Sequence, residues 1–420
     1  MELKQKYRVN GGKKVFGELT VPASKNAILP ILAGTIIAKG VTTLKNCPYI
    51  TDIDNMLMLL EEVGAKVERN DRDIIIDSTN VECGSLSKEV CAKFRSSIFM
   101  LGAMMSRCRF AKVYLPGGCA IGSRGIDLHL DALCQMGVVV REEEDFVFCD
   151  GTNMHSADIY LKFASVGATE NIMMASVLTK GTTTITNAAC EPEIVDLANF
   201  LNVCGARVVG AGTSFISITG VKRLHTTQYE PIPDRIVAGS YLAFCAINNG
   251  KIRLDNAIAN DLVEPINVLK QMGCDVLTSS NAIKLQAPER LKAVNRIRTN
   301  PYPDFPTDLQ SIFMSLLAVS EGKSVIEENV FENRFHNAGE ITKLGGKVEV
   351  VGSNAYIHGT NKLSSGALEG KDLRGTMGLL VLASAINGVS TIGGTQYVER
   401  GYEDLESNLS KIGIDIVRVR

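Results

Sequence analysis

The sequence predicts a two-domain α/β protein built from six repeated units, three in each domain, with apolar helices inside. Three observations support this prediction. A strand–loop–helix–strand pattern recurs along the chain, a glycine ends each amphipathic helix, and each unit has a second helix that is nearly all apolar. The length of 420 residues also exceeds what one hydrophobic core usually supports, so two domains are expected.

The repeat can be read directly from the sequence. Residues 40–67 read GVTTLKNCPYITDIDNMLMLLEEVGAKV, and residues 181–208 repeat the pattern as GTTTITNAACEPEIVDLANFLNVCGARV. Further copies span residues 250–276, 322–348 and 388–416, and a diverged copy lies around 113–140. The glycines that end the helices recur at intervals of 73, 68, 68, 72 and 68 residues: Gly64, Gly137, Gly205, Gly273, Gly345 and Gly413. Glycine suits the left-handed position that follows a helix.

Each unit also has a helix that is apolar on almost every face, and such a helix must be buried on every side. We predict these helices over residues 25–38, 95–105, 166–179, 235–247, 308–319 and 373–386. Three of them, surrounded by sheets and amphipathic helices, account for each domain. A solenoid of stacked repeats is the alternative, and its usual period of roughly 20–50 residues disfavours it.

The chain is expected to cross between the domains twice. The segment YEPIPD at residues 229–234 contains two prolines, which favour an extended conformation. The other candidate crossing is VPAS at residues 21–24. If both are linkers, one domain comprises residues 23–232 and the other comprises residues 1–22 plus 233–420.

The composition excludes several classes of function. The formal net charge of −2 argues against a nucleic acid or an anionic membrane as a partner. The 11 cysteines form no C-x-x-C pair and no metal-like spacing with the 5 histidines, so no structural zinc is expected. The first residues lack the apolar core of a signal peptide, and no apolar run is long enough to span a bilayer. We therefore expect a soluble, cytoplasmic protein.

Basic residues occupy the first turn of four of the six apolar helices: Lys25, Arg95, Arg235 and Arg374. A helix N-terminus already favours anions, so a cation there is unfavourable unless an anion is present. The pattern predicts a cleft that binds a small polyanion. The alternative is that these side chains extend into solvent.

Three further arginines lie in the polar loops before the amphipathic helices: Arg124, Arg334 and Arg400. Arginine suits bidentate binding of carboxylate and phosphate groups. The sequence contains no G-x-x-x-x-G-K-[ST] motif, so a Walker-type nucleotide site is not expected.

The loop LPGGCAIGSR, residues 115–124, is longer and richer in glycine than the corresponding loops, which predicts a mobile lid. Cys119 lies five residues before Arg124, and a neighbouring cation lowers the pKa of a thiol toward neutrality, where it can transfer a proton. We predict that Cys119 is a general acid. Most other cysteines are predicted to pack in cores, for example Cys134, Cys204 and Cys245.

Asp308 is the candidate general base. It opens a predicted buried helix, where it either caps the helix or faces the cleft, and a capping Thr307 would leave it free. His129 is a weaker candidate, because a lone helical histidine more often satisfies a local hydrogen bond. For Asp52 and Asp54, a role beside the site and a purely structural role remain equally open.

These motifs resemble those of the enolpyruvyl transferase family, and within it the enzymes that act on UDP-N-acetylglucosamine. The most specific run is LPGGCAIGSRGIDLH, supported by KNAILPIL, SVGATENIMM, EPEIVDLANFL, FPTDLQ, ENRF, DLRG and ERGYE. The resemblance covers essentially the whole chain and implies an inside-out α/β barrel in two domains. It also implies transfer of the enolpyruvyl group of phosphoenolpyruvate to the 3′-hydroxyl of UDP-N-acetylglucosamine, with release of phosphate and no cofactor. This reaction is the first committed step of peptidoglycan synthesis.

The resemblance also implies roles for individual residues. Those that would bind phosphoenolpyruvate are Lys25, Asn26, Arg124, Arg374 and Arg400. Those that would line the UDP-sugar site are Arg95, Arg124, Gly125, Ile126, Asp127, Leu128, Ser165, Val166, Asp308 and Val330. The catalytic set would be Cys119, Asp308, Lys25 and Arg400, with Cys119 also the thiol alkylated by the antibiotic fosfomycin.

The sequence departs from the commonest family pattern at several positions. Pro22-Ala23-Ser24 replaces Ser-Gly-Ala, Phe163 stands where some members have lysine, and His336-Asn337 replaces Met-His. The resemblance therefore does not predict the details of nucleotide contacts and hinge behaviour at these positions, and the departures spare the catalytic set. The alternative functions are the sister activity on shikimate 3-phosphate, whose enzymes lack the Gly-Gly-Cys lid, and a non-catalytic protein that binds a UDP-sugar.

Overall fold

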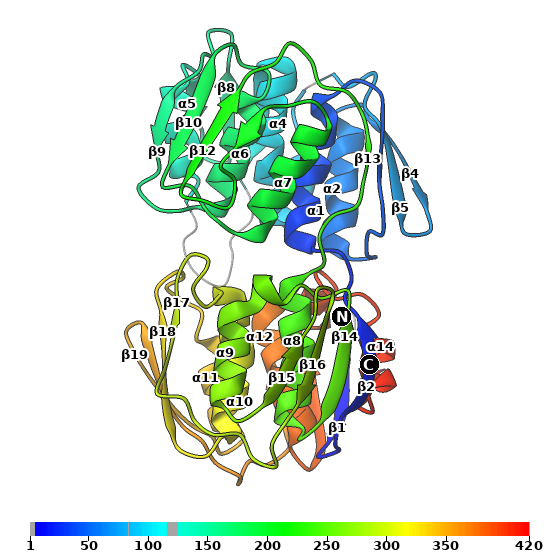
Figure 1. Ribbon diagram of the computed structural model, residues 1–420, viewed down its shortest axis with the longest axis vertical. Helices are drawn as coiled ribbons and strands as arrows, with labels where there is room; N and C mark the ends of the chain where they lie inside the picture. Colours follow the sequence, from blue (N-terminus) through cyan, green and yellow to red (C-terminus); the bar gives the residue numbers. More distant parts are fainter. Residues whose placement is uncertain (1–4, 83, 116–124, 420) are drawn as a thin grey trace. The chain divides into compact units, whose positions relative to one another are not determined.

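The computed structural model describes residues 5–82, 84–115 and 125–419. These residues form two compact units, which are described separately. The terminal unit comprises residues 5–22 and 233–419, and the central unit comprises the described residues from 23 to 232 (Figure 1).

Three buried helices form the interior of the central unit: α1 (Lys25–Gly34), α4 (Phe99–Cys108) and α6 (Val166–Ser176). Helix α4 contacts both α1 and α6. Two short 3₁₀ turns extend these helices, namely η1 (Thr35–Ile37) after α1 and η2 (Arg95–Ile98) before α4. The other helices of this unit are α2 (Thr51–Glu62), α3 (Lys88–Lys93), α5 (Asp127–Gln135) and α7 (Pro192–Val203).

The described residues of the central unit form three sheets. One has the order β13-β3-β5-β4, with β3 (Val41–Leu44), β4 (Lys66–Asn70), β5 (Asp73–Asp77) and β13 (Gln228–Tyr229). The second has the order β6-β8-β7, with β6 (Phe110–Tyr114), β7 (Val139–Glu142) and β8 (Phe146–Asp150). The third has the order β11-β12-β10-β9, with β9 (Asp158–Tyr160), β10 (Thr182–Thr186), β11 (Val208–Val209) and β12 (Phe215–Thr219).

The terminal unit repeats this plan. Its three buried helices, which contact one another, are α8 (Arg235–Ile247), α10 (Gln310–Val319) and α12 (Leu373–Ala385). The remaining helices are α9 (Val263–Gln271), α11 (His336–Lys343), α13 (Thr395–Val398) and α14 (Leu405–Lys411). Two 3₁₀ turns, η3 (Ala259–Leu262) and η4 (Thr307–Leu309), precede α9 and α10.

The described residues of the terminal unit also form three sheets. The first, β21-β22-β1-β23, contains β1 (Lys6–Gly11), β21 (Ala367–Glu369), β22 (Gly388–Gly393) and β23 (Asp415–Val419). The second, β15-β16-β14-β2, contains β2 (Phe16–Thr20), β14 (Lys251–Asp255), β15 (Asp275–Thr278) and β16 (Ala282–Gln286). The third, β17-β18-β20-β19, contains β17 (Arg296–Thr299), β18 (Lys323–Glu328), β19 (Lys347–Val351) and β20 (Asn354–His358). The two N-terminal strands therefore pair with strands from the C-terminal half of the sequence.

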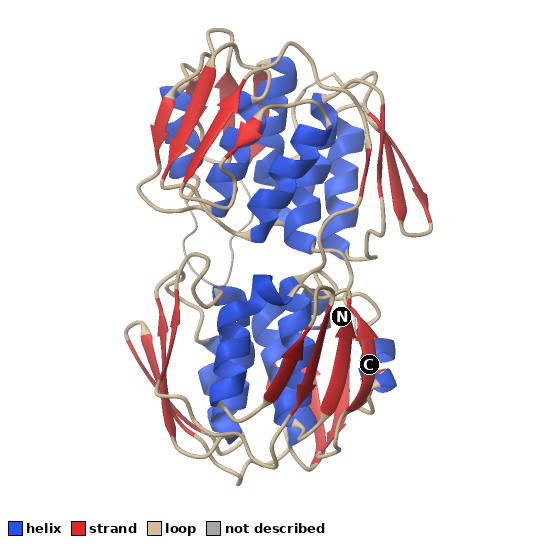
Figure 2. Ribbon diagram, viewed as in Figure 1, coloured by secondary structure: helices blue, strands red, loops and turns tan. Residues whose placement is uncertain are grey.

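The predicted architecture is confirmed, since each unit has helices inside and sheets around them (Figure 2). Helix α8 has the predicted bounds, whereas the segments predicted at 25–38, 95–105 and 308–319 each include a 3₁₀ turn. The six helix-ending glycines have φ values of 91°, 79°, 96°, 96°, 92° and 91°, as a left-handed position requires. Side chains alternate across the strands, so that Ile74 and Ile76 of β5 are buried in the core.

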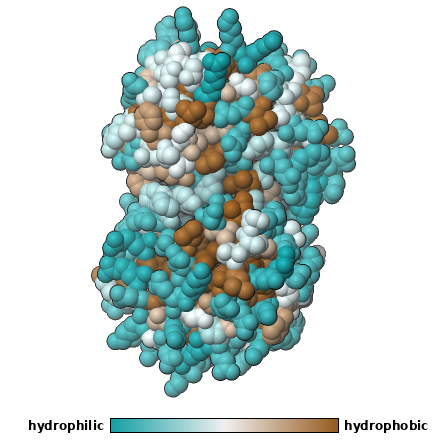
Figure 3. All heavy atoms as spheres, viewed as in Figure 1, coloured by the Kyte–Doolittle hydropathy of each residue, from teal (hydrophilic) through white to brown (hydrophobic). Residues whose placement is uncertain are grey.

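One cysteine prediction is wrong. Cys204 and Cys245 are buried, but Cys134 is exposed because it lies on the outer side of the amphipathic helix α5. The face seen in Figure 3 carries scattered apolar residues among hydrophilic ones in both units, which is ordinary for a protein surface. Within the described ranges, no helix is long and apolar enough to cross a membrane.

Close helix packing in the terminal unit makes a prediction about Gly378 of α12. A Cβ atom at this position would lie 2.6 Å from the Ser311 carbonyl oxygen of α10, so Gly378→Ala forces the two helices apart. We expect this substitution to lower the free energy of unfolding by about 1–3 kcal/mol in urea denaturation. Gly339→Ala on α11 is the control, because no atom lies within 4 Å of its Cβ position. It should be neutral or stabilising by up to about 1 kcal/mol, and equal effects of the two substitutions would contradict the packing argument.

Candidate active site

The described candidate residues of the central unit begin at the N-terminal end of α1. The Lys25 ammonium lies 2.7 Å from an Asp52 carboxylate oxygen, and Asp52 is contributed by the first turn of α2. Asp52 is 1% exposed and Lys25 is 9% exposed, so the pair is buried. Asn26, the next residue of α1, is half-buried. Of the two aspartates whose roles the sequence left open, Asp52 therefore pairs with a candidate site residue, while Asp54 lies 3.5 Å from Arg69.

A second group of candidates surrounds the start of α5. The half-buried Arg95 of η2 donates a hydrogen bond from Nη2 to the Gly125 carbonyl oxygen at 3.0 Å. Ile126 and Asp127 follow at the N-terminal end of α5, with Ile126 buried and Asp127 exposed. Leu128 is partly buried against the core of this unit. Arg95 thus fixes the segment that leads into α5.

Ser165 and Val166 lie at the start of the third buried helix of this unit. The Ser165 hydroxyl accepts a hydrogen bond from the Ala168 N–H at 3.4 Å, so this side chain caps α6. Val166 is the first residue of the helix. Phe163, two residues before Ser165, is 43% exposed.

The His129 side chain is hydrogen-bonded to Asn171 inside the central unit, as expected for a histidine that is not a base. The Asn171 side chain accepts from the Gly102 N–H at 2.6 Å, which orients its amide nitrogen toward His129 Nδ1 at 2.8 Å. His129 Nδ1 must therefore accept this bond, which requires a neutral ring with its proton on Nε2. Burial, with a smaller contribution from the nearby Arg95 cation, lowers the pKa of His129 to about 3.

Two candidates, Cys119 and Arg124, lie outside the described residues. Their roles remain the predictions made from the sequence.

In the terminal unit, the candidate base Asp308 is bound by two arginines. Arg334 Nη2 donates to Asp308 Oδ1 at 2.7 Å, and Arg374 Nη2 donates to Oδ2 at 3.1 Å. The two arginine side chains are 3% and 5% exposed, whereas that of Asp308 is 27% exposed. Each oxygen of the carboxylate thus accepts a charge-assisted hydrogen bond from a different guanidinium group.

The sequence left open whether Asp308 or Thr307 caps the helix, and the structure shows that neither side chain does. Thr307 and Asp308 belong to the turn η4, and neither this turn nor α10 has a side-chain cap. The Thr307 hydroxyl instead donates to the Glu328 carboxylate, at 2.9 and 3.0 Å from its two oxygens, and accepts from Arg334 Nη1 at 2.8 Å. The Thr307 hydroxyl thus accepts from a guanidinium group in place of a helix N–H, and Asp308 is held by the two arginines.

Arg374 lies in the first turn of α12 and is 4% exposed. Burial by itself lowers the pKa of Arg374, but the neighbouring Tyr402, Asp308 and Asp234 outweigh that effect and raise it above its ordinary value. Arg235, in the first turn of α8, is 8% exposed and stacks on Tyr302. The alternative that these cations extend into solvent is therefore wrong for Lys25, Arg235 and Arg374.

Val330 and Arg400 are the remaining candidates of this unit. The Val330 N–H donates to Glu328 Oε1 at 3.0 Å, which fixes the turn after β18. Arg400 lies just after α13 and is half-buried. Glu328 and Tyr402 are not among the residues predicted from the sequence, although Tyr402 lies in the ERGYE motif only two residues after Arg400.

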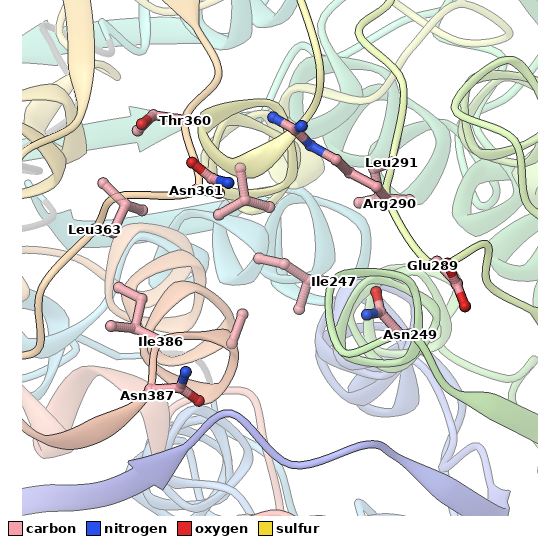
Figure 4. Close-up of a pocket in the computed structure, with 12 residues that line it drawn as sticks. Ile247, Asn249, Glu289, Arg290, Leu291, Thr360, Asn361, Leu363, Ile386 and Asn387 are labelled. Carbon is pink, nitrogen blue, oxygen red and sulfur yellow. The ribbon is translucent and has the colours of Figure 1, made fainter.

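A cavity of about 290 Å³ lies at the other end of the buried helices of the terminal unit (Figure 4). Its lining includes the final residues of α8, α10 and α12, namely Ile247, Val319 and Ala385. Arg235, Asp308 and Arg374 lie at the opposite, N-terminal ends of the same helices, and none of the charged candidates lines the cavity. Within the described part of the chain, no group of three or more His, Cys, Asp or Glu side chains is placed to hold a metal ion.

Solved structures of enolpyruvyl transferases share this fold. The enolpyruvyl transferase NikO from Streptomyces tendae aligns with a TM-score of 0.89 at 22% identity, covering 99% of each chain. EPSP synthase from Acinetobacter baumannii aligns with a TM-score of 0.76 at 18% identity, covering 99% of this chain and 100% of the other. The fold is therefore that of the enolpyruvyl transferases.

Sequence comparison defines the family. The profile of EPSP synthase (3-phosphoshikimate 1-carboxyvinyltransferase) matches residues 9–409, and the chain belongs to this family. It is 44% identical over 414 residues to UDP-N-acetylglucosamine 1-carboxyvinyltransferase 2 of Caldanaerobacter subterraneus. It is 40% identical over 415 residues to UDP-N-acetylglucosamine 1-carboxyvinyltransferase of Geobacter metallireducens. Each alignment covers 99% of both chains. The family resemblance predicted from the motifs is confirmed.

A buried carboxyl group lies within α6, beyond the first turn that carries Ser165 and Val166. Glu170 is fully buried, and among the described residues neither of its side-chain oxygens has a hydrogen-bond partner. Burial, together with the nearby Glu193 and Glu191 carboxyl groups, raises the pKa of Glu170 well above its ordinary value. The folded protein thus holds a proton that the unfolded chain loses above a pH of about 4.3.

This proton makes stability depend on pH. Because the folded-state pKa is raised, the wild type should lose up to about 1.4 kcal/mol of stability per pH unit above about pH 4.3, until the folded-state pKa is reached. Glu170→Gln removes this dependence, so its stability relative to the wild type should increase between pH 5 and pH 7 in urea denaturation. Glu61→Gln, at an exposed position of α2, is the control and should show no such trend. A constant difference between Glu170→Gln and the wild type across this range would refute the assignment.

Proposed function

We propose that the protein transfers the enolpyruvyl group of phosphoenolpyruvate to the 3′-hydroxyl of UDP-N-acetylglucosamine and releases phosphate. The observation that carries the chemistry is the Asp308 carboxylate, partly exposed and held by two buried arginines. The choice of acceptor is supported by the full-length relatives that are named for this sugar nucleotide. In this role the protein acts in the cytoplasm, at the first committed step of peptidoglycan synthesis.

The reaction is an addition followed by an elimination. The sugar hydroxyl oxygen attacks C2 of phosphoenolpyruvate, Asp308 takes the hydroxyl proton, and a proton is added to C3, which we assign to the Cys119 thiol. This gives a tetrahedral intermediate. Loss of a proton from C3 and cleavage of the C2–O bond to phosphate then re-form the double bond as an enol ether. Each general acid or base step contributes on the order of 10²–10⁴-fold to the rate.

Both substrates are anions, so cationic side chains are needed to bind them. We propose that Lys25, Asn26, Arg124, Arg374 and Arg400 bind phosphoenolpyruvate and the departing phosphate. Positive charge placed where negative charge develops stabilises the transition state. For UDP-N-acetylglucosamine we propose Arg95, residues 124–128, Ser165, Val166, Asp308 and Val330. The hydrogen bonds of Arg95 and Asp308 support their inclusion, because each is already held in a fixed orientation.

An assay of phosphate release with two acceptors tests the proposed function. The purified protein is supplied with phosphoenolpyruvate and either UDP-N-acetylglucosamine or shikimate 3-phosphate. We expect phosphate release with the sugar nucleotide alone, at a 1:1 ratio to the enolpyruvyl product. Release with shikimate 3-phosphate alone would assign the sister activity instead. Release with neither acceptor would support a non-catalytic protein that binds a UDP-sugar.

The role of Asp308 predicts a large effect on turnover. Asp308→Asn keeps the size of the side chain but cannot accept the hydroxyl proton, so kcat should fall on the order of 10²–10⁴-fold. Asp304→Asn is the matched control, because Asp304 is exposed in the same segment and should leave kcat unchanged. Near-normal turnover of Asp308→Asn, with the fold intact by circular dichroism, would remove Asp308 from the mechanism.

A further inference from the structure

The two arginines that bind Asp308 are themselves held by separate hydrogen-bonded chains. Within the terminal unit, one chain runs from Arg374 to Tyr402 and Ser240, and the other runs from Arg334 to Thr307 and Glu328. Each chain ends in the interior, far in sequence from Asp308.

In the first chain, the positions of the protons can be deduced. Ser240 donates its hydroxyl proton to the Ile236 carbonyl oxygen at 2.7 Å. The Tyr402 hydroxyl, 2.7 Å from Ser240 Oγ, must therefore donate to Ser240. This leaves a lone pair on Tyr402 to accept from Arg374 Nη1 at 3.1 Å. Tyr402 thus holds one terminal nitrogen of Arg374, Nη1, and the other, Nη2, contacts Asp308.

In the second chain the hydrogen bonds are also donated in sequence from the arginine toward the interior. The Thr307 hydroxyl has one proton, which it gives to Glu328, so it can accept from Arg334 Nη1. Glu328 is 3% exposed, and its Oε1 also accepts from the Val330 and Phe331 N–H groups at 3.0 Å each. Its negative charge is therefore held in place by the backbone. Arg334 then contacts Asp308 through Nη2.

The arrangement leaves the Asp308 carboxylate with one orientation. Each oxygen is bound by a different guanidinium group, and both guanidinium groups are buried. Each also donates a second hydrogen bond, to the Tyr402 or the Thr307 hydroxyl. A carboxylate has about four lone-pair sites, so the two bonds from the arginines do not exhaust its capacity to accept hydrogen bonds. Preorganisation of this kind matters, since a misplacement of about 1 Å can cost on the order of 10²-fold in rate.

We propose that Tyr402 and Glu328 are positioning residues for the base Asp308, acting through Arg374 and Arg334. This inference rests on the proposed function. Tyr402→Phe removes the acceptor for Arg374 but retains the aromatic ring, whose centre lies 5.6 Å from the guanidinium carbon. Glu328→Gln keeps the shape of the side chain and removes the charge that anchors Thr307.

The test measures kcat and both KM values in the phosphate-release assay with phosphoenolpyruvate and UDP-N-acetylglucosamine. We expect Tyr402→Phe and Glu328→Gln each to lower kcat by about tenfold or more, with the KM for the sugar nucleotide within about threefold of the wild type. Because the ionised carboxylate loses part of a charge-assisted hydrogen bond, the acid limb of the kcat profile should move to higher pH. A rise in the KM for phosphoenolpyruvate with an unchanged kcat would overturn the proposal, because it would mean that Tyr402 serves substrate binding alone.

Matched controls separate positioning from stability. Tyr241→Phe removes a buried hydroxyl that hydrogen-bonds Asn408 in the same unit, and Glu340→Gln alters another buried glutamate. Both controls should keep the wild-type kcat and pH profile, even where thermal stability falls. If Tyr402→Phe behaves like Tyr241→Phe, the positioning role is lost while the proposed function stands.

A double variant provides the sharpest discrimination. Single-turnover measurements at high enzyme concentration compare Asp308→Asn with the double variant that also carries Tyr402→Phe. If Tyr402 acts through Asp308, the second substitution should lower the residual rate by less than about twofold, because coupled residues are not additive. A further tenfold loss would mean that Tyr402 acts elsewhere and would overturn the proposal. Absence of turnover by the wild type would refute the proposed function and this inference with it.

Discussion

The burial of cationic side chains at the ends of otherwise apolar helices is the constraint on which the rest of the structure depends. An isolated charge inside a protein is strongly unfavourable, so each buried cation needs a partner of opposite charge or a strong acceptor. Lys25 has the Asp52 carboxylate, and Arg374 has the Asp308 carboxylate and the Tyr402 hydroxyl. The apolar stretches of α1 and α12 supply none of these partners, which come from α2, from η4 and from the segment after α13.

The repeat provides the partners because it brings the connecting segments of each unit to the N-terminal ends of the buried helices. Asp52 comes from the first turn of α2, which follows α1 in the same repeat. Arg334 precedes α11 and reaches η4, whereas Tyr402 follows α13 and reaches the start of α12. In each unit a polar cluster therefore forms at helix ends where the helix dipoles also favour anions.

The sequence was sufficient for the architecture because that information is local and repeated. Helix-ending glycines, apolar helices and strand alternation each depend on neighbouring residues, and all six glycines have the expected backbone conformation. The first-turn cations could also be identified from spacing alone. Their partners could not, since Glu328 and Tyr402 reach Thr307 and Arg374 only after the chain has folded. That neither Asp308 nor Thr307 caps the helix could not be predicted for the same reason, because a local capping rule ignores a distant carboxylate.

The way Asp308 is held also suits the chemistry proposed for it. A carboxylate that accepts two charge-assisted hydrogen bonds is a weak base, which is a disadvantage for removing a proton from a neutral hydroxyl. During the proposed addition, however, the hydroxyl becomes strongly acidic as its oxygen bonds to an electron-poor carbon. A weak base is then sufficient to take the proton. Fixed orientation therefore contributes more than basicity to such a step, and this is what two buried guanidinium groups provide.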